Sequence, residues 1–176
     1  MSGGRPRTIV RMLPYRDYLT WCGSQLVVTA GTDRESARNK RLVVAAAPDW
    51  RLRPLVRAPT RAFGSIRCAP HGRSLVAQSA PASDDPGFFA TRWALWRVGL
   101  GGSLRRLTSP PPGYADDSPH WSQDGRTILF VRSHQGSGKL YAWRDGRVVG
   151  PFALVGNRLG YYGHRDWWQG MSWTQG

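Results

Sequence analysis

Short apolar segments alternate with polar, glycine-rich segments along most of the chain. The apolar segments have the length of strands and are rich in β-branched and aromatic residues: LVVTA, RLVVAA, LVAQS, RWALWRV, ILFVRS and KLYAWR. They lack a clean alternation of apolar and polar positions, which is typical of sheets packed on both faces. No helical periodicity extends beyond a turn or two. The pattern predicts an all-β protein.

One of these units repeats along the chain. Residues 66–79 (IRCAPHGRSLVAQS) align with 119–133 (PHWSQDGRTILFVRS), so that Cys68 matches Trp121 and Gly72 matches Gly125. A third copy, with a turn two residues shorter, covers 19–31 with Trp21 in the same place, and a fourth begins at 171 with Trp173. The anchors 21, 68, 121 and 173 are spaced by 47, 53 and 52 residues. Such spacing fits the blade of a β-propeller.

The repeat predicts a β-propeller of four-stranded antiparallel blades. We expect blades at 15–60, 61–113 and 114–157, flanked by the outer strand of a preceding blade at 1–11 and the start of a next blade at 158–176. The turns at Asp124-Gly125 and Asp145-Gly146 suit tight hairpins. About three blades with two flanking strands make an incomplete ring. We therefore expect either a portion of a longer propeller or self-association through open, apolar blade faces.

The segments PHWSQDGRTILFVRS and GKLYAWRDG resemble the propeller repeat of the TolB-like family, with Gln123 where that family prefers Pro. The resemblance is strong over 117–152, good over 64–108 and weaker over 15–55. It implies a non-catalytic scaffold with a protein or cell-envelope component as partner. It also implies a periplasmic or extracytoplasmic location. The chain's own N-terminus carries basic residues without the apolar region of a secretory signal.

Charge and cysteine content exclude further classes of function. The formal net charge is +14, but the 25 Lys and Arg residues are scattered without a block of five, which disfavours specific nucleic-acid binding. No apolar run is long enough to span a membrane. Only two cysteines, Cys22 and Cys68, are present. We expect buried free thiols, with one disulfide between neighbouring blades as the alternative.

The candidate binding residues lie in or near the segments expected to lead into each innermost strand, at 14–18, 60–64, 113–119 and 160–170. In a propeller such segments gather around the mouth of the central channel, where ligands often bind. The candidates are Asp17, Arg67, Tyr114, Asp116, Asp117, His120, His164 and Asp166. Asp17 and Asp117 both lie four residues before their anchor. The alternative is that these two are turn residues that accept backbone N–H groups.

No catalytic motif supports an enzyme. The chain lacks G-x-S-x-G and H-E-x-x-H, and its histidines (71, 120, 134 and 164) have no metal-ligand spacing. The glycine-rich segment 99–103 (GLGGS) joins two strands and is therefore not a phosphate loop of the strand-to-helix type. We expect no cofactor and no metal. The alternative function is an accessory propeller domain of a hydrolase, or a metal-dependent enzyme with its site at the channel mouth.

Overall fold

The computed structural model describes residues 8, 15–31, 40–82, 92–135 and 137–154. Within these ranges the chain forms three four-stranded antiparallel sheets and no helix. No described element is therefore a helix long and apolar enough to cross a membrane. The predicted flanking strands at 1–11 and 158–176 lie outside the described residues, Thr8 excepted.

Each sheet is built from four strands that follow one another in sequence, and we call the sheets the first, second and third blade. The first blade contains β1 (Tyr15–Cys22), β2 (Gln25–Gly31), β3 (Arg41–Ala46) and β4 (Arg53–Pro54). The second contains β5 (Arg61–Cys68), β6 (Ser74–Pro81), β7 (Ala94–Gly99) and β8 (Leu104–Arg106). The third contains β9 (Ala115–Trp121), β10 (Thr127–His134), β11 (Ser137–Arg144) and β12 (Arg147–Leu154).

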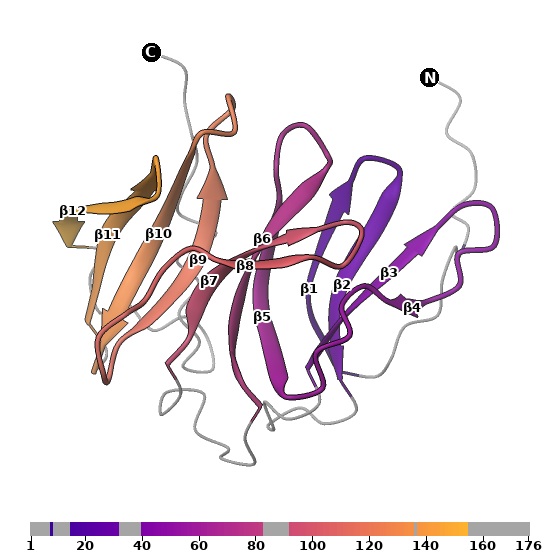
Figure 1. The fold of residues 1–176 in the computed structure, drawn as a ribbon, viewed down its shortest axis with the longest axis horizontal. Coiled ribbons are helices and arrows are strands. Elements are labelled where there is room, and N and C mark those ends of the chain that lie inside the picture. Colours follow the sequence, from indigo (N-terminus) through magenta and orange to yellow (C-terminus); the bar gives the residue numbers. More distant parts are fainter. Residues whose placement is uncertain (1–7, 9–14, 32–39, 83–91, 136, 155–176) are drawn as a thin grey trace.

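The three blades lie side by side, with the second blade between the first and the third (Figure 1). The first strands of successive blades, β1, β5 and β9, are neighbours in space. We call this side of the molecule the inner edge. The expected architecture of four-stranded antiparallel propeller blades is confirmed.

The two largest clusters of the core lie between neighbouring blades. Val27 and Leu42 of the first blade pack with Phe63 and Leu75 of the second. On the opposite face of the second blade, Val76 and Leu95 pack with Ile128 and Phe130 of the third. The second blade is thus buried on both faces, which explains why the β6 sequence is apolar without alternation.

The register of the sheets confirms the alignment of the repeat. Cys68 pairs with Leu75 and Trp121 with Ile128, whereas Trp21 pairs with Leu26 across the shorter turn. Each of the longer turns contains a glycine with positive φ, +66° at Gly72 and +68° at Gly125. Each glycine N–H donates to the carbonyl three residues earlier at 2.9 Å, so the two turns have the same backbone hydrogen bond.

The turn of the third blade is reinforced by side chains that the second blade lacks. Ser122 Oγ donates to the Asp124 carboxylate at 2.6 Å, and the Arg126 N–H donates to the same carboxylate at 3.0 Å. These hydrogen bonds hold the pKa of Asp124 below its ordinary value. Ala69 and His71 occupy the equivalent positions in the second blade and cannot form this network.

A disulfide joins the first and second blades. Cys22 at the end of β1 is bonded to Cys68 at the end of β5, with a Cα–Cα distance of 5.3 Å. The expectation of free thiols is therefore wrong, and the alternative of an inter-blade disulfide is correct. The physical reason is that the inner strands of adjacent blades lie side by side. This brings Cys22 opposite Cys68 even though Trp21 is its counterpart in the repeat.

Substitution of Gly72 tests the close approach of neighbouring turns. A Cβ at Gly72 would lie 3.0 Å from the backbone nitrogen of Gly23 in the adjacent blade, and the residue has positive φ. Gly72→Ala should therefore lower the free energy of unfolding by about 2–3 kcal/mol, through backbone strain and crowding together. Gly146→Ala is the matched control, because Gly146 has φ +79° and no atom within 4 Å of its Cβ position.

The control should lose only the strain contribution, about 1–2 kcal/mol. Urea denaturation of both variants measures the difference. Equal losses would show that the contact between the two turns contributes nothing to stability.

Apolar side chains are exposed in the first and third blades, which are the two outer blades of the row. In β12 of the third blade, Phe152 is 59% exposed and Leu154 75% exposed. A hollow of about 680 Å³ on this blade is lined by Leu129, Leu140, Ala142, Val149 and Phe152, among others. In β1 of the first blade, Leu19 and Trp21 are about half exposed. Self-association through these faces stays a prediction.

Candidate functional site

The inner strands of all three blades are interrupted by β-bulges. The register shifts at Asp17 in β1, at Gly64–Ser65 in β5 and at Ser118–Pro119 in β9. Each shift lies two to four residues before the anchor of its blade. Bulges change the direction of side chains and are frequent next to binding sites. The expectation that 14–18, 60–64 and 113–119 are loops is therefore wrong over most of their length. Most of each segment forms the first part of an inner strand, and the bulges interrupt the regular pairing of that strand.

Asp117 links the second and third blades at these bulges. Its carboxylate accepts a hydrogen bond from Ser65 Oγ of β5 at 2.7 Å. It also accepts the N–H of Ser118, which has a φ of +53°. Asp117 thus accepts a backbone N–H, as the turn interpretation requires, but from the next residue rather than from two positions on. The contact with Ser65 in addition fixes the carboxylate between two blades.

Arg67 and His120 follow Ser65 and Asp117 in the same two strands. Each precedes the anchor of its blade by one residue, and each is half-buried. A ring nitrogen of His120, Nδ1, is 3.1 Å from the carbonyl oxygen of Ser118. Burial lowers the pKa of the Arg67 guanidinium. The Arg67 carbonyl accepts the indole N–H of Trp121 at 3.2 Å, so the anchor of the third blade is held by the second.

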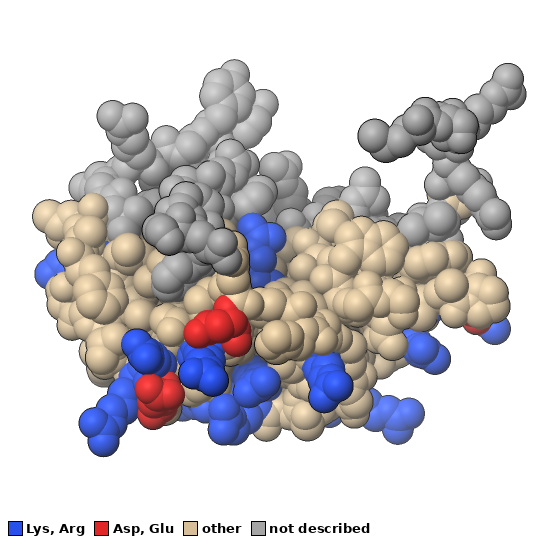
Figure 2. Space-filling view, turned by 90° about the horizontal axis from the view of Figure 1, so that it is seen from above, with Lys and Arg blue, Asp and Glu red and all other residues tan. Residues whose placement is uncertain are grey.

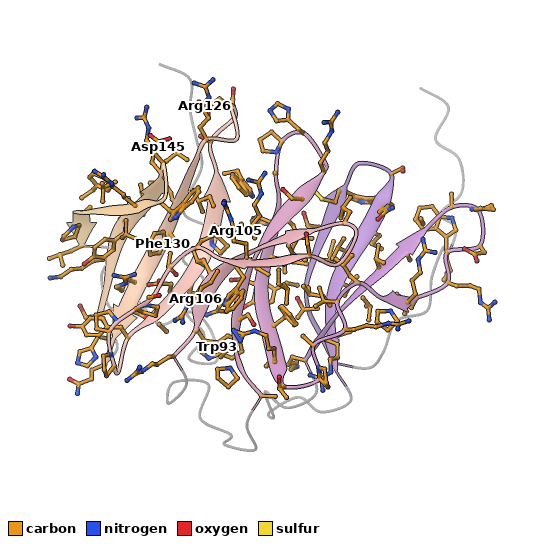
Figure 3. All side chains as sticks on the ribbon, in the orientation of Figure 1. Trp93, Arg105, Arg106, Arg126, Phe130 and Asp145 are labelled. Atoms are coloured by element: carbon orange, nitrogen blue, oxygen red, sulfur yellow. A yellow bond between two sulfur atoms is a disulfide. The ribbon has the colours of Figure 1, made fainter. Side chains whose placement is uncertain are left out.

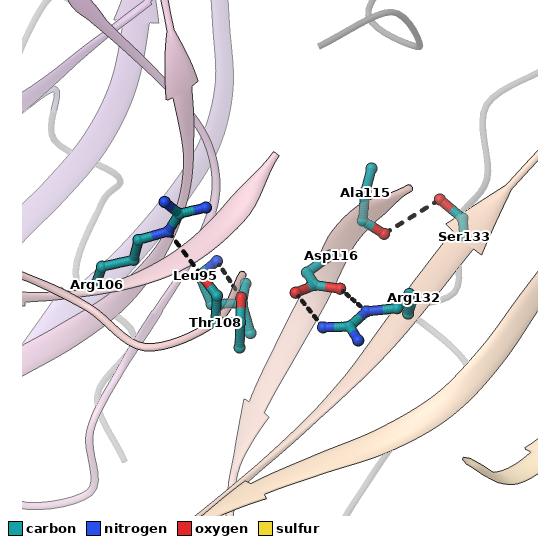
Figure 4. A network of polar contacts seen from close by, with 7 residues as sticks. All are labelled: Leu95, Arg106, Thr108, Ala115, Asp116, Arg132 and Ser133. Carbon is teal, nitrogen blue, oxygen red and sulfur yellow. Dashed lines mark hydrogen bonds and ion pairs between the residues drawn. The ribbon is translucent and has the colours of Figure 1, made fainter. Parts of the chain in front are cut away.

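Asp116 has a different role from its neighbour. Its carboxylate is fully buried and forms a bidentate pair with Arg132 of β10, Nε to Oδ1 at 2.6 Å and Nη2 to Oδ2 at 2.9 Å (Figure 4). The Asp116 N–H donates to the carbonyl of Trp93 in the second blade at 2.9 Å. Burial alone would lower the pKa of Arg132, but the hydrogen bond and charge of Asp116 raise it above its ordinary value. This pair leaves no accessible carboxylate at position 116.

The other predicted residues lie elsewhere in the inner-strand region or outside the described residues. Tyr114 stacks on the ring of His134, with centroids 4.4 Å apart, just before β9. Asp17 lies at the bulge of β1. His164, Asp166 and the anchor Trp173 lie outside the described residues. Of the predicted set, the structure therefore brings Arg67, Asp117 and His120 to the same pair of inner strands.

Two residues of this region were missed by the sequence analysis. Ser65 occupies the repeat position of Ser118, so the alignment of the copies could have identified it. Gln78 is buried, and a Cβ on Gly64 would clash with its side-chain amide. Gly64 occupies the repeat position of Asp117. The Gln78 side chain therefore takes the space that an aspartate would need in the second blade, and the acidic group appears in the third blade instead.

The arrangement offers a hydroxyl, a carboxylate, an imidazole and a guanidinium on two adjacent strands. These groups can form hydrogen bonds and ion pairs with a polar ligand. Among the described residues, no three His, Cys, Asp or Glu side chains are grouped so that they could hold a metal ion.

These blades are similar to those of several known proteins. No family model matches the chain. The curated Tol-Pal system protein TolB 1 of Novosphingobium aromaticivorans is 46% identical over 44 residues, which is 25% of this chain and 9% of the relative. The structure of a putative TolB from Agrobacterium tumefaciens matches with a TM-score of 0.62 at 20% identity, over 86% of this chain. This chain has a TolB-like β-propeller fold.

The chain spans about half the length of the Agrobacterium TolB structure, 53% of it, and a much smaller share of the curated relative. TolB-like blades are also shared with enzymes. An oligogalacturonate lyase in complex with manganese matches with a TM-score of 0.62 at 15% identity, covering 86% of this chain and 40% of the lyase. A puromycin hydrolase matches with a TM-score of 0.54 at 19% identity, over 72% and 22% of the two chains. The TolB-like fold alone therefore does not separate binding from catalysis.

Proposed function

We propose that this TolB-like chain is a non-catalytic scaffold that binds a protein of the cell envelope at the inner edge of its second and third blades. The observation that carries the proposal is the Ser65–Asp117 contact at the bulges. Half-buried Arg67 and His120 follow Ser65 and Asp117 in the same two strands. A carboxylate that is already oriented by a hydroxyl and a backbone N–H needs little reorganisation to bind a partner.

The disulfide supports an extracytoplasmic location for this scaffold. Disulfides persist in oxidising compartments such as the periplasm and are rare in reducing ones. Cys22 is 1% exposed and Cys68 is partly buried. A periplasmic location agrees with a partner in the envelope. The relative is named as a Tol-Pal system protein, and we propose Pal as the partner to test first.

Asp117→Asn tests the binding site with little change of shape. The substitution keeps a hydrogen-bond acceptor and removes the charge, so the fold should persist. A hydrogen bond to a charged group is worth about 1.5–3 kcal/mol, so affinity for Pal from the same genome should fall about ten- to hundredfold. Isothermal titration calorimetry with the full chain measures this affinity.

Asp145→Asn is the matched control. Asp145 lies in the exposed hairpin between β11 and β12, 83% exposed, and the substitution removes the same charge. Asn also tolerates the positive φ of +50° found there. Affinity should stay within about twofold of the unmodified chain. Equal losses in both variants would indicate that only the overall charge matters. No binding of Pal by the unmodified chain would reject Pal as the partner.

The competing function is an enzyme, or an accessory domain of one, with Asp117 and His120 at its site. The structural likeness to a lyase and a hydrolase is the observation in its favour. The same variant separates the two functions. Asp117→Asn in an enzyme should reduce turnover while leaving ligand binding nearly intact, whereas in a scaffold it should reduce binding itself.

A further inference from the structure

Two arginines of the second blade face each other without an acidic partner. Arg97 of β7 and Arg105 of β8 are direct cross-strand partners. Like charges directly opposite each other on a sheet are destabilising. The ion pairs found among the described residues involve neither side chain. Figure 2 shows how far lysine and arginine outnumber acidic side chains on one side of the molecule.

The two arginines line a hollow of about 270 Å³ together with Ser74, Gly99, Ser103 and Leu104. Arg97 Nε donates to Ser74 Oγ at 3.1 Å, which orients the guanidinium and leaves its two terminal nitrogens available. The Arg97 guanidinium also lies 5.9 Å from the centre of the Trp121 ring in the third blade. Arg97 is therefore positioned from two sides.

The Gly99–Ser103 turn shapes one side of this hollow. The Gly99 N–H donates to the Ser103 carbonyl at 3.0 Å, and the Gly102 N–H donates to the Gly99 carbonyl at 2.9 Å. Ser103 Oγ lies where a Cβ on Gly99 would clash, so the serine hydroxyl reaches the hollow only because position 99 is glycine. The glycine-rich segment that is not a strand-to-helix phosphate loop thus brings a hydroxyl next to two guanidinium groups.

We propose that this hollow binds a small, doubly charged oxyanion of the phosphate class. Two guanidinium groups match the charge and geometry of such an anion, and arginine recognises phosphate through paired N–H donors. The hydroxyls of Ser103 and Ser74 supply further hydrogen bonds. An anion between Arg97 and Arg105 would also relieve their mutual repulsion. The hollow, at about 270 Å³, is smaller than the about 300–1,000 Å³ of most small-molecule sites, and it can admit a phosphate group.

The side chains of β8 provide a matched control. Arg105 and Arg106 are consecutive in β8 (Figure 3). Both are exposed. Successive side chains of a strand point to opposite faces, so Arg106 lies on the other face of the blade. It pairs with Trp96 across the strands, and its Nε donates to the Thr108 carbonyl. Arg105→Gln and Arg106→Gln therefore remove the same charge from opposite faces.

Calorimetric titration of the full chain with inorganic phosphate tests the proposal. We expect the unmodified chain to bind one phosphate, Arg105→Gln and Arg97→Gln to bind it about ten- to hundredfold more weakly, and Arg106→Gln to bind it within about twofold. Phosphate should also raise the melting temperature of the unmodified chain and of Arg106→Gln more than that of Arg105→Gln. This second readout shows that each variant is folded.

Two results would overturn the proposal. Equal weakening by Arg105→Gln and Arg106→Gln would mean that phosphate responds only to the net charge of the protein. The absence of saturable phosphate binding by the unmodified chain would mean that the hollow is not a site for the free anion. If a phosphomonoester binds more tightly than inorganic phosphate, the natural ligand is a phosphate group on a larger molecule. The same variants should then weaken the binding of both ligands.

Discussion

Reduction of the Cys22–Cys68 disulfide is expected to lower the free energy of unfolding by about 4 kcal/mol. The bond joins residues 46 apart in the sequence, in the inner strands of two adjacent blades. In the chain-entropy model, a cross-link that closes a loop of this length removes about 4 kcal/mol of conformational freedom from the unfolded state. Denaturant unfolding with and without reductant measures the difference.

Two controls keep this prediction specific. Alkylation under denaturing, non-reducing conditions should label neither cysteine, and after reduction it should label both, as mass spectrometry can count. The double variant Cys22→Ser with Cys68→Ser should lose at least as much stability as the reduced protein. An unchanged unfolding midpoint after verified reduction would contradict the prediction, because it would mean that the cross-link does not restrict the unfolded chain.

The loss of stability after reduction should be largest in the strands close to the Cys22–Cys68 disulfide. The disulfide joins the first and second blades, whereas the second and third are joined by the Ser65–Asp117 and Trp121–Arg67 hydrogen bonds. Hydrogen exchange after reduction should therefore increase more in β1 and β2 than in β10 and β11. A uniform increase would indicate that the three blades unfold as a single cooperative unit.

The blades could be predicted from the sequence because their signals are local and repeated. The turn around Gly125 recurs around Gly72, and both are followed by apolar strands. Each copy supports the same interpretation, so errors in one copy are corrected by the next. The Asp145-Gly146 hairpin is confirmed for the same reason, since positive φ at both residues is a local requirement of a two-residue turn.

The contacts between blades could not be predicted from the same signals. A repeat alignment states which residues are equivalent, but not which residues of adjacent blades meet. Cys22 therefore faces Cys68 although Trp21 is its equivalent. In the same way, the adjacent aspartates 116 and 117 appear alike in the sequence. Asp116 pairs with Arg132 within its own blade, whereas the bulge brings Asp117 to Ser65 of the second blade.

Breaking the Asp116–Arg132 pair should cost about 3–5 kcal/mol. The Asp116 side chain is fully buried and the Arg132 side chain is 13% exposed, so Asp116→Asn leaves a guanidinium without its counter-charge in a site with little access to water. Chemical denaturation measures the change in the free energy of unfolding. Asp145→Asn is again the control, since the Arg144–Asp145 pair is exposed and separated by 3.4 Å, and its loss should change stability by less than about 1 kcal/mol.

A double-mutant cycle shows whether the cost comes from the pair itself. Arg132→Met alone leaves the Asp116 carboxylate buried without a cation and should be about as costly as Asp116→Asn. The double variant removes both charges, so it should lose clearly less stability than the sum of the two single variants. Additive losses would mean that the two side chains stabilise the blade independently. The contact between Arg132 and the ring of Tyr141, 5.1 Å away, would then explain the arginine's contribution better than its ion pair does.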